Sequence, residues 1–97
     1  MAVCVMISWP NISTDEYDLA RETVGWEREA PVGGLFHIAM HDGAGFRIVD
    51  LWESPEAFQA FVEDRLTPGL QKAGITTEPV VEVFPPHAVF APGYTAK

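Results

Sequence analysis

Cysteine and basic residues are scarce in this sequence, and each shortage excludes a class of protein. The 97 residues include one cysteine, Cys4, so no internal disulfide and no CxxC metal or redox site can form. Six Lys and Arg residues stand against 14 Asp and Glu residues, which gives a net charge of −8. A surface of this charge repels phosphate backbones and anionic headgroups. We therefore expect a cytoplasmic protein that binds neither nucleic acid nor membranes.

Long apolar runs and nucleotide-binding motifs are also missing. The apolar segment 1–9 is far shorter than the roughly 20 residues that span a bilayer, has no basic flank and stops at Pro10. We interpret it as a buried strand and not as a signal peptide. The sequence contains no GxGxxG, P-loop or nucleophile-elbow motif. It therefore gives no support for a flavin, a nicotinamide or a hydrolytic triad.

The composition is that of an ordinary globular protein, but the chain is short. Apolar residues make up 47% of it and charged residues 21%, so we expect one domain that spans residues 1–97. A domain of this size buries a modest fraction of its surface on folding. The sequence therefore predicts association with a partner.

The first half of the chain predicts one strand and one helix. Residues 3–9 form a continuous apolar run, which is typical of an internal strand buried on both faces. Ser13 and Glu16 have the spacing of a capping box, so a helix is predicted over about residues 14–24. Gly25 has the position of its C-terminal stop.

The second half predicts a hairpin followed by a second helix. Two apolar-rich runs, 35–41 and 46–53, are separated by Asp-Gly-Ala-Gly, which is typical of a tight turn between antiparallel strands. Ser54 and Pro55 then provide a capping hydroxyl and a proline at the first helical position. This helix should end at Gly74.

The last part of the chain predicts a fourth strand and a tail with apolar side chains. Pro68 and Gly69 should kink the second helix or split off its last turn, and residues 80–84 form a strand between prolines. Large apolar residues seldom stay exposed together. We therefore expect the tail, residues 86–97, to pack on a dimer through the side chains of Val89, Phe90 and Tyr94.

The order strand, helix, strand, strand, helix, strand predicts an α+β, ferredoxin-like βαββαβ fold with a four-stranded antiparallel sheet. Through the segments GGLFHIA at 33–39 and VDLWESPEAFQAFVEDRL at 49–66, the chain resembles the dimeric α+β barrel superfamily. That superfamily includes antibiotic-biosynthesis monooxygenases, small polyketide cyclases and heme-degrading monooxygenases. The resemblance covers most of the chain and is specific for the fold rather than for an activity.

The resemblance implies a homodimer with a ligand pocket in each subunit. Members pair two four-stranded sheets into a barrel, with the helices outside it and the pocket between sheet and helices. Trp52 matches a pocket tryptophan that several members place at the end of this strand. The heme-degrading members bind the heme iron through a histidine on the second helix. Residues 55–73 contain no histidine, so heme is not expected. The monooxygenase branch works without a cofactor, and no cofactor is predicted.

Alternation along the hairpin predicts that one face of the sheet carries a polar pair. The turn aligns the strands so that His37 lies opposite Asp50. The same alignment places Leu35 opposite Trp52. An imidazole beside a carboxylate and an aromatic ring suits a general base, while the simpler interpretation is a cross-strand pair that only adds stability. The other face should fill a barrel with the side chains of Phe36, Ile38, Met40, Val49 and Leu51.

Metal binding is not predicted from the histidines. His37 and His41 should lie about 13 Å apart along their strand, which is too far to share a metal ion. His87 has no second ligand at a suitable spacing. Cys4 lies in an apolar strand and is expected to be an inert core residue.

Two functions stay open at this point. The first is a cofactor-independent monooxygenase-like or cyclase-like enzyme for a small aromatic or polyketide-type substrate. In it, His37 and Asp50 act as the acid and base pair, and the substrate lies against Trp52, Phe58, Phe61 and Leu35. The second is a non-catalytic dimeric module that binds a small apolar ligand or stabilises a partner protein.

Overall fold

The structure, a computed structural model, contains a four-stranded antiparallel sheet in the order β2-β3-β1-β4. The structure describes residues 1–95, without the side chains of residues 94 and 95. The predicted contact of Tyr94 therefore lies outside the described part. The arrangement confirms the ferredoxin-like βαββαβ fold. The elements are β1 (Val3–Pro10), α1 (Thr14–Val24), β2 (Gly34–His41), β3 (Gly45–Trp52), α2 (Pro55–Phe61), the π-helical η1 (Val62–Leu66), α3 (Thr67–Ala73), β4 (Val80–Phe84) and α4 (Pro92–Thr95).

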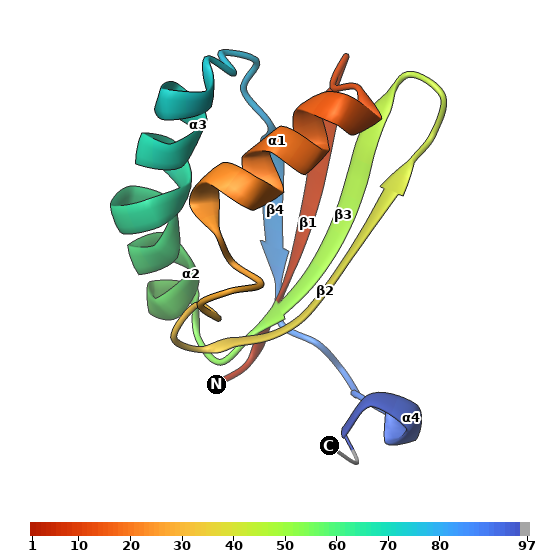
Figure 1. Cartoon of the computed structure of the whole chain (residues 1–97). Helices are drawn as coiled ribbons and strands as arrows, with labels where there is room; N and C mark the ends of the chain where they lie inside the picture. The colour runs from red at the N-terminus through yellow and green to blue at the C-terminus, as the bar shows by residue number, and fades with distance from the viewer. Residues whose placement is uncertain (96–97) are drawn as a thin grey trace.

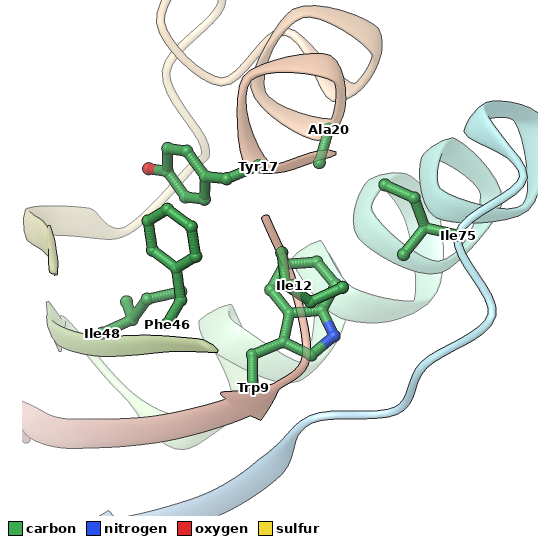
Figure 2. Close-up of a cluster of buried hydrophobic side chains, with 7 residues drawn as sticks. All are labelled: Trp9, Ile12, Tyr17, Ala20, Phe46, Ile48 and Ile75. Atoms are coloured by element: carbon green, nitrogen blue, oxygen red, sulfur yellow. The ribbon is translucent and has the colours of Figure 1, made fainter. Parts of the chain in front are cut away.

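The helices α1, α2 and α3 lie on one side of the sheet, which we call the covered face (Figure 1). Alternate residues of β1 and β3 point to this side, and Val5 is fully buried there. Figure 2 shows the larger buried cluster, in which the ring of Tyr17 lies 4.6 Å from that of Phe46 between centroids. Its members are Trp9, Ile12, Tyr17, Ala20, Phe46, Ile48 and Ile75. The core therefore lies between the sheet and the helices.

Helix α1 begins and ends where the sequence predicts. The N–H of Glu16 donates to the Ser13 hydroxyl over 3.1 Å, and the Ser13 N–H donates to the Glu16 carboxylate over 3.0 Å. Gly25 adopts a left-handed conformation with φ 77° and ends the helix. The capping box thus holds the helix in a fixed position over the covered face.

The second helix is divided near Pro68, close to the predicted alternative of a separate last turn. The π-helical turn η1 directly precedes α3, which begins at Thr67. A proline has no N–H to donate. The wider turn moves the acceptor by one residue, so that the N–H of Thr67 donates to the carbonyl of Val62, five residues earlier. Helix α3 then continues to Gly74, whose left-handed conformation ends it as predicted.

The β2–β3 hairpin has the predicted register except at its open end. His37 lies opposite Asp50, as expected. The prediction that Leu35 lies opposite Trp52 is wrong, because a bulge at the start of β2 adds one residue to that strand. Gly34 takes the position opposite Trp52 instead.

The other side of the sheet, the open face, has no helix over it in the described part of the chain (Figure 1). Met6 on the internal strand β1 is 44% exposed, so the prediction that this strand is buried on both faces is wrong for a single chain. The strand registers place apolar side chains from all four strands on this face: Cys4, Met6, Phe36, Ile38, Met40, Val49, Leu51, Val80 and Phe84.

The chain beyond β4 runs away from the sheet and its helices. The short helix α4 lies apart from them (Figure 1). Phe90 is 90% exposed and Val89 is 56% exposed, so neither packs on its own chain. Among residues 1–95, no helix has the length and apolar character needed to cross a membrane.

Candidate functional site

A cavity of about 190 Å³ lies between the covered face of the sheet and the helices. Side chains from β1, α1, β2, β3 and the second helix line it, and nearly all of them are apolar. The six residues predicted for the site all line this cavity: Leu35, His37, Asp50, Trp52, Phe58 and Phe61. Their functional role stays a prediction, but they share one cavity.

Hydrogen bonds connect three of the side chains that the sheet contributes to the cavity. His37 Nδ1 lies 2.7 Å from Asp50 Oδ1, and Trp52 Nε1 donates to Asp50 Oδ2 over 3.1 Å. Asp50 is only 6% exposed, yet each carboxylate oxygen has a partner, as a buried polar group requires. A proton on His37 Nδ1 therefore faces the carboxylate, which fixes the tautomer and the orientation of the ring.

The second ring nitrogen of His37 is occupied by a residue from another element. The hydroxyl oxygen of Tyr17 in α1 lies 2.7 Å from His37 Nε2. Because Nδ1–H faces Asp50, Nε2 accepts this bond and the Tyr17 hydroxyl donates it. In the sequence, Tyr17 lies near the apolar stripe of the first predicted helix, which indicates only a core or pocket side chain. The available signal was that a buried tyrosine hydroxyl usually finds a partner.

The environment of Tyr17 opposes negative charge on its phenol. Burial raises the pKa of Tyr17 to about 12. Neighbouring charges act in both directions: Arg21 lowers the pKa, while carboxylates raise it, namely those of Glu27, Asp50 and Asp18. The phenol therefore stays protonated at neutral pH. Its oxygen keeps lone pairs to accept a hydrogen bond from a ligand hydroxyl.

Aromatic side chains of α2 close the cavity on the helix side. The rings of Phe58 and Phe61 lie 5.5 and 5.3 Å from that of Trp52. Arg65 lies over the ring of Phe61, and its guanidinium donates to two carbonyl oxygens at the C-terminal end of α1 over 3.3 and 3.4 Å. This arginine ties the second helix to the first and holds the aromatic side of the cavity in place.

His41, the other histidine of β2, belongs to the hairpin and not to the cavity. Its Nε2 lies 3.2 Å from the carbonyl oxygen of Ile12, and its Nδ1 accepts a hydrogen bond from the N–H of Gly43. It does not line the cavity. Within the described residues, no group of three or more His, Cys, Asp or Glu side chains could hold a metal ion.

Comparison with known proteins gives a fold. No family model and no curated protein matches the sequence. NE2512, a protein of unknown function from Nitrosomonas europaea, superposes with a TM-score of 0.72 at 14% identity over 95% of each chain. SnoaB, a cofactor-independent oxygenase from Streptomyces nogalater, gives 0.63 at 12% identity over 91% of this chain and 94% of its own. A monooxygenase from the gene ActVA-Orf6 of Streptomyces coelicolor, in complex with nanaomycin D, gives 0.55 at 22% identity over 95% and 92%.

The sheet order, the one layer of helices and the cavity between them define a ferredoxin-like α+β domain with a cavity under its helices. More particularly, the chain shares its fold with a cofactor-independent oxygenase, with a monooxygenase and with a protein of unknown function. Identities of 12 to 22% extend this likeness to the fold alone.

Proposed function

We propose that this protein is a cofactor-independent, monooxygenase-like or cyclase-like enzyme that acts on a small aromatic or polyketide-type molecule. The observation that carries the proposal is the hydrogen-bonded series of Tyr17, His37 and Asp50 along an apolar cavity. The fold shared with a cofactor-independent oxygenase supports it. Both reactions begin when an acidic substrate loses a proton, and the series is suited to accept one.

The series gives that proton a path. A substrate hydroxyl that donates to the Tyr17 oxygen can pass its proton there while the proton of Tyr17 moves to His37 Nε2. The imidazolium that results is stabilised by Asp50, whose Oδ1 lies 2.7 Å from Nδ1. Because the pKa of Tyr17 is about 12, a free tyrosinate is costly, and the two transfers must be coupled.

Loss of the proton prepares the substrate for either reaction. An arenolate is electron-rich, and dioxygen can take electrons from it directly. Conversion of a ring CH₂ to C=O uses one O₂ and releases one H₂O, so no further oxidant or reductant is required. In a cyclisation, the enolate attacks a carbonyl carbon of the same substrate. The protein orients the ring, excludes water and accepts the proton.

Turnover of a panel of hydroxyarenes and polyketide-type compounds tests the proposal, followed by oxygen uptake and by product analysis. His37→Ala and Asp50→Asn should each reduce turnover by about 10²-fold, with the oligomeric state unchanged. His41→Ala is the matched control, because it removes an imidazole from the same strand outside the cavity. Equal losses in all three variants would contradict a specific role for the pair.

The alternative is a non-catalytic module that holds a small apolar ligand. It is favoured by the fact that His37, Asp50 and Trp52 already satisfy one another's hydrogen bonds within the chain. In that case both variants lower the melting temperature and leave ligand affinity nearly unchanged. Stoichiometric retention of an aromatic ligand without oxygen uptake or cyclisation would decide for this alternative.

We further propose that the chain is a cytoplasmic homodimer in which a second copy covers the open face. Met6, Ile38 and Met40 on this face are each between 43% and 45% exposed. Monomeric proteins rarely expose so continuous an apolar area. In this arrangement residues 1–97 form one domain, and the tail 86–97 packs on the second copy.

A further inference from the structure

Within the described residues, the lining of the cavity contains no Lys or Arg. Among residues 1–95, the ionisable side chains that line it are Tyr17, His37 and Asp50. Arg65 on the adjoining helix uses its guanidinium on backbone carbonyls of the α1 end. A ligand that enters as an anion would therefore meet no Lys or Arg side chain there, whereas an arenolate formed in the cavity faces the imidazolium that its own proton creates on His37.

The charges near the polar end of the cavity are unfavourable to an anion as well. Carboxylates of Glu27, Asp50 and Asp18 raise the pKa of Tyr17, and a ligand carboxylate would meet the same repulsion. Arg21, the cation that opposes them, is paired with Asp18 and Glu27 at 3.5 and 3.8 Å. An ionised group buried without a partner is far more costly than a neutral hydroxyl that is hydrogen-bonded.

The size of the cavity sets a second limit. Its volume of about 190 Å³ lies below the range of roughly 300 to 1,000 Å³ for drug-sized ligands. It is only moderately larger than a cavity of about 150 Å³ that holds benzene. Phe58 and Phe61 contact Trp52 at one end, and Tyr17 stacks on Phe46 at the other. This volume is close to that of a ligand with one ring or two fused rings.

We propose that this site selects uncharged hydroxyarenes of one or two rings, whose hydroxyl hydrogen-bonds to Tyr17, and that it rejects carboxylates and larger polycyclic molecules. This inference rests on the proposed function and narrows its substrate class. Among aromatic and polyketide-type compounds, it excludes those with an ionised acid group or with three or more fused rings.

Calorimetric titration of the purified full chain at neutral pH tests both limits with four probes. 2-Naphthol should bind, and 2-naphthoate, which has the same rings but an ionised group, should bind at least about tenfold more weakly. 1-Hydroxypyrene keeps the hydroxyl but has four rings, and it should also bind at least about tenfold more weakly. Naphthalene measures the contribution of the rings alone. The inference is overturned if 2-naphthoate or 1-hydroxypyrene binds as tightly as 2-naphthol. It is also overturned if 2-naphthol does not bind.

Two variants test whether 2-naphthol binds in this cavity. Tyr17→Phe removes one oxygen atom and should weaken 2-naphthol binding by about tenfold while naphthalene binding stays the same. Tyr94→Phe, the same change at the other tyrosine of the chain, is the control. A Tyr17→Phe protein that binds 2-naphthol as tightly as the wild type overturns the assignment.

Leu35→Arg tests the charge limit by gain of binding. Leu35 lines the cavity and is 52% exposed, so a longer side chain can keep its charged end near solvent. The variant should bind 2-naphthoate about tenfold more tightly than the wild type does. If it binds 2-naphthoate no better, the missing counter-ion is not what excludes anions, and the charge limit is overturned.

These titrations separate the inference from the proposed function. Tyr17-dependent binding of 2-naphthol without turnover of any hydroxyarene refutes the enzyme and leaves the selectivity intact. Turnover of anionic or larger substrates by a protein that does not bind 2-naphthol supports the enzyme and refutes the selectivity.

Discussion

Both faces of the sheet are rich in apolar side chains, but their polar side chains lie in different places. On the covered face, His37 and Asp50 lie in the middle of their strands, buried in part or whole and hydrogen-bonded to each other. On the open face, the polar side chains lie near the hairpin end or on an edge strand, and Arg47 forms an ion pair with Asp42 of the turn at 2.9 Å. Polar side chains thus lie at the margins of the open face and in the middle of the covered face.

This difference indicates separate tasks for the two faces. A second copy could cover the centre of the open face without burying an unpaired polar group, which is the usual obstacle to association. On the covered face, the hydrogen-bonded series and the cavity both lie within one chain. Changes on one face should therefore alter assembly, and changes on the other should alter ligand binding and chemistry.

The largest expected effect comes from a charge on the open face. Ile38→Glu should weaken the dimer by at least about 100-fold, or about 2.8 kcal/mol, because the carboxylate would be buried against apolar side chains of the second copy. Val32→Glu is the control, since Val32 lies in the loop before β2 and is 90% exposed. Analytical ultracentrifugation over a concentration series measures the dissociation constant.

The same pair of variants tests whether the two faces have separate tasks. A wild-type protein that is monomeric at micromolar concentration would refute the dimer, and equal dissociation constants for both variants would refute this face as its interface. If Ile38→Glu also abolishes ligand binding, the two faces are not independent.

A smaller effect on assembly is expected from the tail. Deletion of residues 88–97 should lower the melting temperature and weaken the dimer by about tenfold. Replacement of Val89 and Phe90 by serine in the full chain should reproduce most of this effect, because both side chains are exposed in the single chain. An unchanged melting temperature and dissociation constant in both variants would show that the tail does not pack on the second copy.

The sequence predicts features that depend on neighbouring residues, and most of these are confirmed. The capping box of Ser13 and Glu16 and the stop at Gly25 are local, and so is the turn that sets His37 opposite Asp50. The bulge between Gly34 and Phe36 is different, because it lies beside a close contact with a distant helix. The preceding Gly33 adopts φ 84°, and a Cβ there would lie 2.6 Å from the Cβ of Ala57 in the second helix.

The partner of His37 shows a second limit of sequence reasoning. Alternation assigns a residue to a face of the sheet, but it does not specify which helical side chain lies above it. Tyr17 is 20 residues away in the sequence and reaches His37 only because α1 crosses the covered face. The same limit applies to the open face, where the pattern predicts apolar side chains without specifying what covers them.

The smallest expected effect concerns the pH dependence of the covered face. Burial raises the pKa of Tyr17 from its ordinary value of 10.0 to about 12, so the folded chain holds this proton more firmly than the unfolded chain does. The group therefore contributes stability below a pH of about 10, and this contribution is lost as the pH rises to about 12. Tyr17→Phe should lose less stability than the wild type across this window. Urea unfolding at several alkaline pH values measures the difference, in which groups common to both proteins cancel. Identical pH profiles for Tyr17→Phe and the wild type would mean that folding does not raise the pKa of this phenol. The argument for coupled proton transfer through Tyr17 would then fail.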